Sequence, residues 1–354
     1  MTAHEVARRL TRGVNLSHWY GQVYMEPGYT PEHYASYNRD ADLDLIARMG
    51  FDHVRFPLAL ERLIAADGPD LDDDFASRVR REVDRLQARG LTVVVDLHPE
   101  NEFKDALAAD DAAVDRFVAT WVRVAERFAD TDPASTVFEV LNEPSIGDAA
   151  RWGDILRRSI TAIRSRAPHH TILVSGDHYS EIPRLLELPE LDDGNLVANF
   201  HLYDPVALSH QGAGWSPDWL QQTRGLDYPV DAENVATLRA AATDPSALAA
   251  LDEYAVEGWD RDRYRRLVEP AAAWARERGL PLTCNEFGVY REFAPRAGRL
   301  RWLEDVTSVF EELGIGWTAW DYAGDFAVAI GERGHREPDV DVLAALGLGP
   351  SPRR

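Results

Sequence analysis

The sequence predicts a (β/α)₈ barrel, an α/β fold in which eight parallel strands close into a cylinder surrounded by helices. Eight short apolar runs, rich in β-branched residues, alternate with amphipathic stretches along the 354 residues. The runs are apolar almost throughout, which is typical of strands buried on both faces of a parallel sheet. Helix patterns fill most of the gaps. An open doubly wound sheet is the alternative, and the polar residues at the strand ends favour the barrel.

The strand candidates lie far enough apart for a helix to fit between most of them. The connection between the sixth and the seventh is much longer than the others. The eight runs span residues 12–16, 53–56, 91–97, 137–141, 171–174, 196–200, 280–284 and 314–320.

The helix candidates carry start and stop signals. Residues 40–49 precede Gly50, and glycine is suited to the left-handed residue that ends a helix. The pattern over 75–89 follows three aspartates, has its arginines later and ends before Gly90. This order of charges favours a helix through its dipole. The other helix patterns span 112–128, 149–166, 260–278 and 298–313.

The long connection is an insert over residues 201–259, after strand six. It could form a lid or wall of a binding cleft. It could also be a surface loop whose aromatic residues pack on a small core of their own. We expect one catalytic domain over 1–349 and a loose tail over 350–354. The aromatic residues of the insert include Trp215, Trp219, Tyr228, Tyr254 and Trp259.

Charge and composition exclude several kinds of partner. The chain has 38 basic and 60 acidic residues, a net charge of −22, so we expect it to bind neither nucleic acid nor anionic membrane. The single cysteine, Cys284, excludes an internal disulfide framework and a thiolate metal cluster. No transmembrane run or signal-peptide core is seen. The chain as given is therefore expected to be cytoplasmic, with a secreted mature form as the alternative, and its oligomeric state is not predicted.

Polar and aromatic side chains stand at the carboxyl ends of nearly all the predicted strands. In a barrel of this kind, this is the end that carries the active site. Buried charges need partners, so these groups are expected to form one network. They are His18 and Trp19, Arg55, His98, Asn142 and Glu143, Asp177, His178 and Tyr179, His201 and Tyr203, Glu286, and Trp320.

Two glutamates are the most informative of these residues. Glu143 follows strand four, and Glu286 ends strand seven. These strands lie on opposite sides of a barrel, so the two carboxyl groups can face each other across a cleft. Glycoside hydrolysis needs such a pair, and a separation of ~5–5.5 Å is typical of enzymes that retain the anomeric configuration. The pair predicts a glycosidase.

Seven segments, in this order, resemble glycoside hydrolase family 5, the cellulase family of clan A. The resemblance covers about residues 12–327. It implies a retaining β-glycosidase, endo- or exo-acting, that needs no metal or cofactor and acts on a carbohydrate, with β-1,4-glucan or β-gluco-oligosaccharides as the leading substrates. The segments are Arg12-Gly13-Val14-Asn15-Leu16, Val54-Arg55-Phe56-Pro57, Asp96-Leu97-His98, Leu141-Asn142-Glu143-Pro144, His201-Leu202-Tyr203, Asn285-Glu286-Phe287-Gly288 and Trp317 to Trp320.

The resemblance also implies roles for individual residues. Glu143 matches the acid/base and Glu286 the nucleophile. Asn142 matches the residue that binds the sugar 2-hydroxyl. The remaining implied substrate contacts are Arg55 against the nucleophile, Tyr203 beside it, the cleft histidines His98 and His201, and the platform Trp320. From their places at strand ends, His18, Trp19, His178 and Tyr179 are also expected to contact substrate.

The sequence departs from the family pattern in two places. Asn285 stands where a glycine is common before the nucleophile, and residues 175–179 replace a Gly-Gly-Trp type of segment. Both places lie near expected sugar-binding positions, so they affect the substrate rather than the chemistry. β-Mannan, β-1,3-glucan and a β-glycoside with a non-sugar group therefore remain alternatives.

Three other classes of protein are alternatives to the glycosidase. A metal-dependent barrel hydrolase usually carries a His-x-His motif at the end of strand one, where this chain offers only His18, and it would lose activity with a chelator. A catalytically weak carbohydrate-binding barrel would bind sugars without turning them over. A scaffold barrel would have no reason to gather polar groups at one end.

Overall fold

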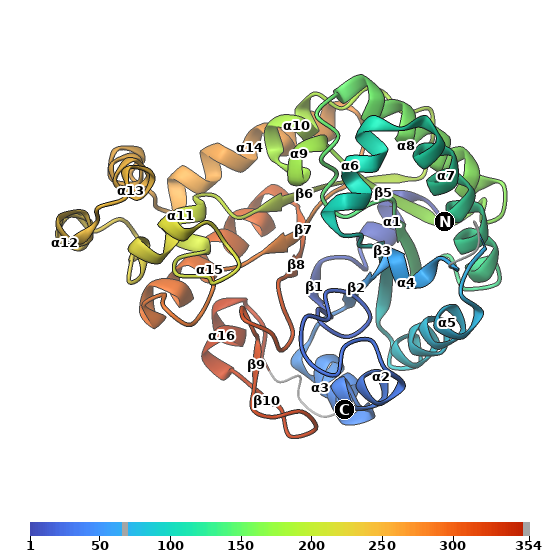
Figure 1. Cartoon of the computed structure of the whole chain (residues 1–354), viewed down its shortest axis with the longest axis horizontal. Coiled ribbons are helices and arrows are strands. Elements are labelled where there is room, and N and C mark those ends of the chain that lie inside the picture. Colours follow the sequence, from blue (N-terminus) through green and yellow to red (C-terminus); the bar gives the residue numbers. More distant parts are fainter. Residues whose placement is uncertain (66–69, 350–354) are drawn as a thin grey trace.

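The computed structural model describes residues 1–65 and 70–349, and its centre is a closed barrel of eight parallel strands (Figure 1). Neighbouring strands pair in chain order, and β1 pairs with β8 to close the ring. The predicted barrel is therefore confirmed, and the open sheet is wrong. The tail expected over 350–354 lies outside the described residues. The strands are β1 (Arg12–Asn15), β2 (His53–Leu58), β3 (Thr92–Leu97), β4 (Thr136–Glu139), β5 (Thr171–Ser175), β6 (Leu196–Leu202), β7 (Leu282–Phe287) and β8 (Gly316–Ala319).

All six predicted helices form, with ends that differ from the prediction by no more than a few residues. Gly50 ends one of them with a φ of 95°, the left-handed conformation expected there. Among the described residues, none of the helices is both long and apolar enough to cross a membrane. The six are α3 (Asp40–Met49), α5 (Asp73–Gln87), α7 (Asp111–Phe128), α8 (Ala149–Arg164), α14 (Arg261–Glu277) and α15 (Arg296–Leu313).

Several shorter elements were not predicted, because most of them are too short to show a periodic pattern. A two-stranded hairpin follows β8 and is formed by β9 (Ala329–Ile330) and β10 (Glu337–Pro338). The short helices outside the insert are α1 (Ala3–Ala7), α2 (Pro31–Tyr37), α4 (Leu60–Leu63), α6 (Asn101–Ala109), α9 (Asp177–Ser180), α10 (Ile182–Leu186) and α16 (Val340–Ala345).

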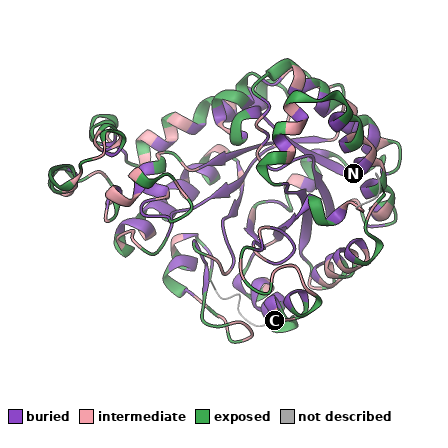
Figure 2. Cartoon of the chain, viewed as in Figure 1, coloured by how far each residue is buried: buried purple, intermediate pink, exposed green. Residues whose placement is uncertain are grey.

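The barrel strands are buried almost throughout (Figure 2). At the amino end, the interior is filled by apolar residues such as Val94, Val137 and Leu173, and Val6 of α1 packs against them. Full burial of one such side chain stabilises the fold by roughly 1.5–3 kcal/mol. At the carboxyl end, the interior is polar instead. The barrel is thus a closed core at one end and a site at the other.

The insert after β6 has two parts, of which one lines a cleft and the other packs on the main core of the barrel. The first part lines a cleft, as a wall does, through Val206, His210, Trp215, Ser216 and Pro217. Further along, Tyr228 and Trp259 are buried and pack on the ring of Tyr264 in α14, with ring centroids 5.8 and 5.0 Å away. All three belong to the main hydrophobic core, so the interpretation as a loop with a small core of its own is wrong. The helices α12 and α13 project from one side of the barrel (Figure 1). The elements of the insert are α11 (Val206–Ser209), η1 (Asp218–Thr223), α12 (Ala232–Ala241) and α13 (Pro245–Glu257).

Candidate active site

A cleft of about 1170 Å³ opens at the carboxyl end of the barrel. Its lining includes seven of the residues singled out at the strand ends, so side chains far apart in the sequence share one space. The loops after β1, β5, β6, β7 and β8 supply the outer lining. The seven are His18, Glu143, Tyr179, His201, Tyr203, Glu286 and Trp320, and the other lining residues include Gln22, Tyr24, Glu181, Asp204, Trp215, Arg291, Asp325 and Phe326.

The two glutamates face each other across this cleft. One oxygen of Glu143, one of Glu286 and one ring nitrogen of His201 all lie within 4.8 Å of one another. The Nδ1 atom of His201 is 3.1 Å from Glu143 Oε1 and 3.7 Å from Glu286 Oε2, so the imidazole bridges the pair. Burial lowers the pKa of His201 to about 4, and the ring is therefore neutral near pH 7.

The loop that carries Glu143 is held in an unusual conformation. Glu143 has a φ of 45°, in the left-handed region that side chains other than glycine rarely adopt. The carboxylate of Asp177 accepts hydrogen bonds of 2.7 Å from the N–H groups of both Ile146 and Gly147. The loop after β5 thereby fixes the loop after β4, and this explains how Glu143 can be kept in a strained position.

Both carboxylate oxygens of Glu286 are bound by donors. Arg55 Nη1 donates to Oε1 over 2.6 Å, and the hydroxyl of Tyr203 donates to Oε2 over 3.0 Å. Burial, and then the nearby charge of Glu286, raises the pKa of Tyr203 well above its ordinary value, so the phenol keeps its proton and remains a donor. The Glu286 carboxylate is therefore fixed in orientation.

Arg55 is completely buried and is shared by three carboxylates. Its Nε and Nη2 atoms lie 2.7 and 2.9 Å from the oxygens of Glu139, and Nη2 lies 3.0 Å from Asp96. Burial alone would lower the pKa of Arg55, but Asp96, Glu139 and Glu286 outweigh it and raise the pKa well above the usual range. Burial raises the pKa of Asp96 to about 6 and also raises that of Glu139.

Asn142 is held in one orientation by groups on either side of its amide. Its oxygen accepts from Arg55 Nη2 over 2.8 Å, and its nitrogen lies 3.0 Å from His98 Nε2. Burial lowers the pKa of His98 to about 3, so the ring is neutral. Its Nδ1–H group donates a hydrogen bond to the Asp96 carboxylate over 2.8 Å. His98 Nε2 must then accept from Asn142. The amide has two N–H groups, and this bond uses one of them.

Gly288 allows the main chain of Trp320 to pass close to the chain at the end of β7. A Cβ at Gly288 would lie 2.6 Å from the carbonyl oxygen of Trp320, too close for any residue but glycine. The Trp320 ring lines the cleft and lies nearly parallel to His98, with centroids 6.2 Å apart. A flat ring in the cleft that holds the two glutamates is a surface on which a sugar ring can pack.

Comparison with known proteins agrees with this arrangement. The family model described as Cellulase (glycosyl hydrolase family 5) matches residues 15–325. The chain belongs to glycosyl hydrolase family 5. It is a cellulase-like glycoside hydrolase, as its sequence segments implied, and the catalytic cleft of such an enzyme is the expected place for the paired glutamates.

Relatives span nearly the whole of this hydrolase. Endoglucanase C of Acetivibrio thermocellus is 29% identical over 317 residues, which cover 88% of this chain and 90% of the relative. Cellodextrinase A of Ruminococcus flavefaciens is 29% identical over 324 residues, which cover 87% of this chain and 84% of the relative. The crystal structure of endoglucanase Cel5A from Thermotoga maritima superimposes with a TM-score of 0.80 at 23% identity, covering 98% of this chain and 100% of the other. This likeness supports the barrel fold.

Five of the expected substrate contacts of this hydrolase are absent from the lining of the cleft. Arg55, His98 and Asn142 are buried in the hydrogen-bond network around Glu286, whereas Trp19 and His178 lie elsewhere. Trp19 is fully buried, and its Nε1 donates to the carbonyl of Tyr34 over 2.8 Å, so its expected contact with substrate is wrong. His178 lines a separate hollow beside Arg184 instead. It belongs to three consecutive left-handed residues, 178–180, a turn that leaves Tyr179 in the cleft and His178 outside it. His18 lines the cleft as expected.

Sequence reasoning missed some of the residues that surround the candidate catalytic pair. Glu139 is not among the predicted site residues, although a lone charge within the apolar run 137–141 is a usable signal. Asp96 was noted only as part of a motif. Tyr24 and Trp215, whose exposed fractions are 70% and 56%, line the cleft of the hydrolase, and nothing in their neighbouring residues indicates which way they face.

One group among residues 1–65 and 70–349 has the side chains and the spacing to hold a metal ion, and it is the same Glu143, His201 and Glu286. Carboxylate oxygens and an imidazole nitrogen suit zinc and several other divalent ions. The site that would cut a glycoside is thus also the place where a metal-dependent rival would have to bind its ion.

Proposed function

We propose that this glycoside hydrolase cuts β-1,4-glucan or β-gluco-oligosaccharides by a retaining double displacement between Glu286 and Glu143. The observation that carries the proposal is the approach of the two carboxylates to within 4.8 Å of each other around His201. Retaining enzymes hold their carboxyl groups at about 5–5.5 Å, whereas inverting enzymes leave room for a water molecule between them.

In the first step, Glu286 attacks the anomeric carbon of the sugar. A new ester bond forms between a Glu286 oxygen and that carbon, while the bond to the leaving oxygen breaks and Glu143 gives its proton to that oxygen. Arg55 and Tyr203 aim the attacking carboxylate through their hydrogen bonds. The second N–H of Asn142 is available for the sugar 2-hydroxyl.

In the second step, Glu143 acts as a base. It takes a proton from a water molecule, the water oxygen bonds to the anomeric carbon, and the ester bond to Glu286 breaks. The charge of Glu286 is neutralised while the ester exists, which makes it easier for Glu143 to be an anion at this stage. Two inversions at the same carbon yield a product of retained configuration.

The substrate class rests on the relatives and on the shape of the site. Two relatives bear the names endoglucanase and cellodextrinase, which point to β-1,4-linked glucose. A β-mannan is the second candidate, because Cel5A of Thermotoga maritima has been solved with mannotriose as well as with cellobiose. The exposed aromatic rings of Tyr24, Tyr179 and Trp215 give the cleft flat surfaces of the kind that bind sugar rings.

A panel of substrates with NMR detection of the products tests the proposal. The kcat/KM values on aryl β-glycosides and on soluble β-1,4-, β-1,3- and mannose-based polysaccharides would be compared. The anomer that forms first would be identified by NMR. We expect the highest kcat/KM on the β-1,4-glucan series, with a β-anomer as first product and no loss of rate with a chelator. Binding without turnover on all of them, an α-anomer or inactivation by the chelator would contradict the proposal.

A further inference from the structure

The strand that carries Glu286 contains a β-bulge immediately before this residue. Phe200 of β6 pairs with Cys284 of β7, but the next residue, His201, pairs with Glu286. Asn285 is therefore an extra residue that has no partner in the register of β6. Bulges of this kind occur next to active sites, where they change the direction in which a side chain points.

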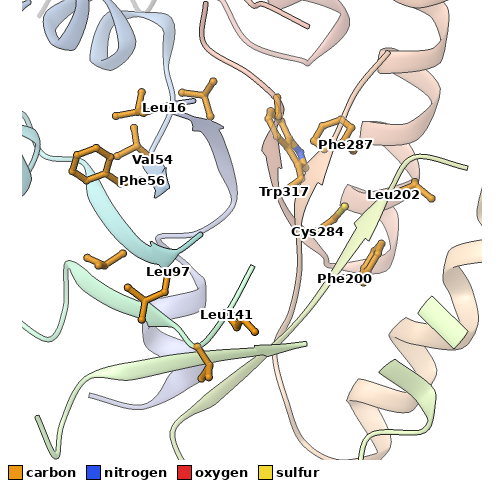
Figure 3. Close-up of a cluster of buried hydrophobic side chains, with 14 of the residues drawn as sticks. Leu16, Val54, Phe56, Leu97, Leu141, Phe200, Leu202, Cys284, Phe287 and Trp317 are labelled. Carbon is orange, nitrogen blue, oxygen red and sulfur yellow. The ribbon is translucent and has the colours of Figure 1, made fainter. Parts of the chain in front are cut away.

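The bulge decides which face Glu286 occupies. Cys284 and Phe287 lie in the same buried apolar cluster as Phe200 and Leu202, in the layer between sheet and helices (Figure 3). In a regular strand, residues three apart point to opposite faces. Because Asn285 is inserted between them, Phe287 can stay in the apolar layer while Glu286 points into the cleft.

Asparagine side chains take over the hydrogen bonds of the main chain at the bulge. The N–H of Asn285 donates to Asn199 Oδ1 over 3.0 Å, and the carbonyl of Asn285 accepts from Asn15 Nδ2 over 2.9 Å. Asn199 and Asn15 are both fully buried. The side chain of Asn285 also donates to Glu139 Oε2 over 2.9 Å, the oxygen that Arg55 Nε binds. The bulge is thus joined to the network that orients the nucleophile.

We propose that Asn199 is a positioning residue, which fixes the bulge through the N–H of Asn285 and thereby aims Glu286 at the anomeric carbon. The inference rests on the proposed function, in which Glu286 is the nucleophile. Without an acceptor, the buried N–H of Asn285 loses its partner, and the bulge is free to shift along β7. A shift by one residue would turn Glu286 to the other face, and a displacement of about 1 Å costs on the order of 100-fold in rate.

The reaction of Glu286 with a 2,4-dinitrophenyl 2-deoxy-2-fluoro-β-cellobioside measures its positioning directly. In this reaction a Glu286 oxygen bonds to the anomeric carbon as dinitrophenolate leaves, and release of the phenolate gives a limiting rate and a half-saturating concentration. For Asn199→Ala we expect the limiting rate to fall about 100-fold, while the half-saturating concentration changes less than about threefold, because the cleft itself is intact.

Two further variants separate positioning from packing. Asn199→Asp keeps an oxygen in reach of the Asn285 N–H and should recover at least about a tenth of the wild-type rate. Asn234→Ala removes an amide of the insert that binds the carbonyl of Gly225 over 2.9 Å and the N–H of Asp227 over 3.0 Å, and it should leave the rate unchanged. If Asn199→Ala does not fold, Asn199→Ser takes its place, because the serine hydroxyl is too short to reach the N–H of Asn285.

The outcomes distinguish this inference from the function on which it rests. Peptide mass analysis of the wild type should find the label on Glu286, and a wild type that is not labelled there overturns the proposed function and this inference with it. A labelled wild type, together with an Asn199→Ala variant that reacts as fast, overturns the inference alone. So does an Asn199→Asp variant that is no faster than Asn199→Ala.

Discussion

Tyr203 donates a hydrogen bond of 3.0 Å to Oε2 of Glu286, on the side of the carboxylate away from Arg55. The two donors therefore hold one oxygen each, and the carboxylate cannot rotate without losing one of them. Hydrogen bonds to charged groups contribute about 1.5–3 kcal/mol, roughly twice as much as neutral ones. This relationship between two side chains is what makes Glu286 an oriented group.

Replacement of Tyr203 by phenylalanine removes this donor and little else. We expect Tyr203→Phe to lower kcat/KM by roughly 10- to 100-fold, the loss that corresponds to one hydrogen bond to a charged group. Kinetics on an aryl β-cellobioside would measure it. The control is Tyr254→Phe, which removes a hydroxyl that donates to the Asp227 carbonyl over 2.7 Å within the insert. Equal losses in both variants, or none in Tyr203→Phe, would refute the proposed role.

Asn142 can be tested together with the sugar group that it is expected to bind. Asn142→Ala should slow the hydrolysis of an aryl β-glucoside by about 10- to 100-fold, because a hydrogen bond that strengthens in the transition state is lost. The same variant should have little effect on the 2-deoxy analogue, which has no 2-hydroxyl. The readout is the coupling between the two changes in kcat/KM. Additive effects would show that Asn142 does not bind this hydroxyl.

Trp215 is expected to bind the outer sugars of a long substrate. Its ring is 56% exposed and stands edge-on to Tyr290, with centroids 5.0 Å apart. Trp215→Ala should raise KM for a long β-glucan several-fold, by analogy with aromatic stacking worth about 1–3 kcal/mol. A small aryl glucoside should be cleaved normally. Val256→Ala, in an exposed position on α13, serves as the control. An equal loss of activity on the long glucan and on the small aryl glucoside would contradict a role of Trp215 in binding the outer sugars.

His170 should make the fold less stable in acid. Burial lowers its pKa to about 4, whereas an unfolded histidine titrates near 6.5. The contribution of His170 to the free energy of unfolding is therefore fully present above pH 6.5. It falls as the pH drops from 6.5 towards 4, by at most about 1.4 kcal/mol per pH unit for one group. Urea unfolding of His170→Gln between pH 4 and 7 should show a shallower decline than the wild type. Parallel curves would contradict the assignment.

The barrel could be predicted because its signals are local. An apolar run such as 91–97 identifies a buried strand, and a glycine such as Gly50 marks the end of a helix, without reference to the rest of the chain. Which residues of the insert are buried and which line the cleft depends on long-range packing instead. Tyr228 is buried against Tyr264, while Trp215 faces the cleft, and no local pattern separates the two rings.

Site residues could be predicted where they lie at the end of a strand. They were missed or misplaced where the local backbone conformation decides the direction in which the side chain points. Glu143 and Glu286 were found in this way, and the structure brings them together. Trp19 and His178 also follow strands, but the first turns into the core and the second lies in a left-handed turn. The bulge at Asn285 is equally invisible in the sequence, because it is defined by its pairing with β6.

Azide trapping tests the central claim, the division of labour between Glu143 and Glu286, most directly. Each glutamate is changed to alanine, and each variant is given an activated aryl β-cellobioside with sodium azide. With Glu143→Ala, azide should attack the glycosyl ester and yield the β-glycosyl azide; with Glu286→Ala, it should attack the substrate directly and yield the α-glycosyl azide. The NMR coupling constant of the anomeric proton distinguishes the two products. The reverse pattern, or turnover of both variants at the wild-type rate without azide, would contradict the account.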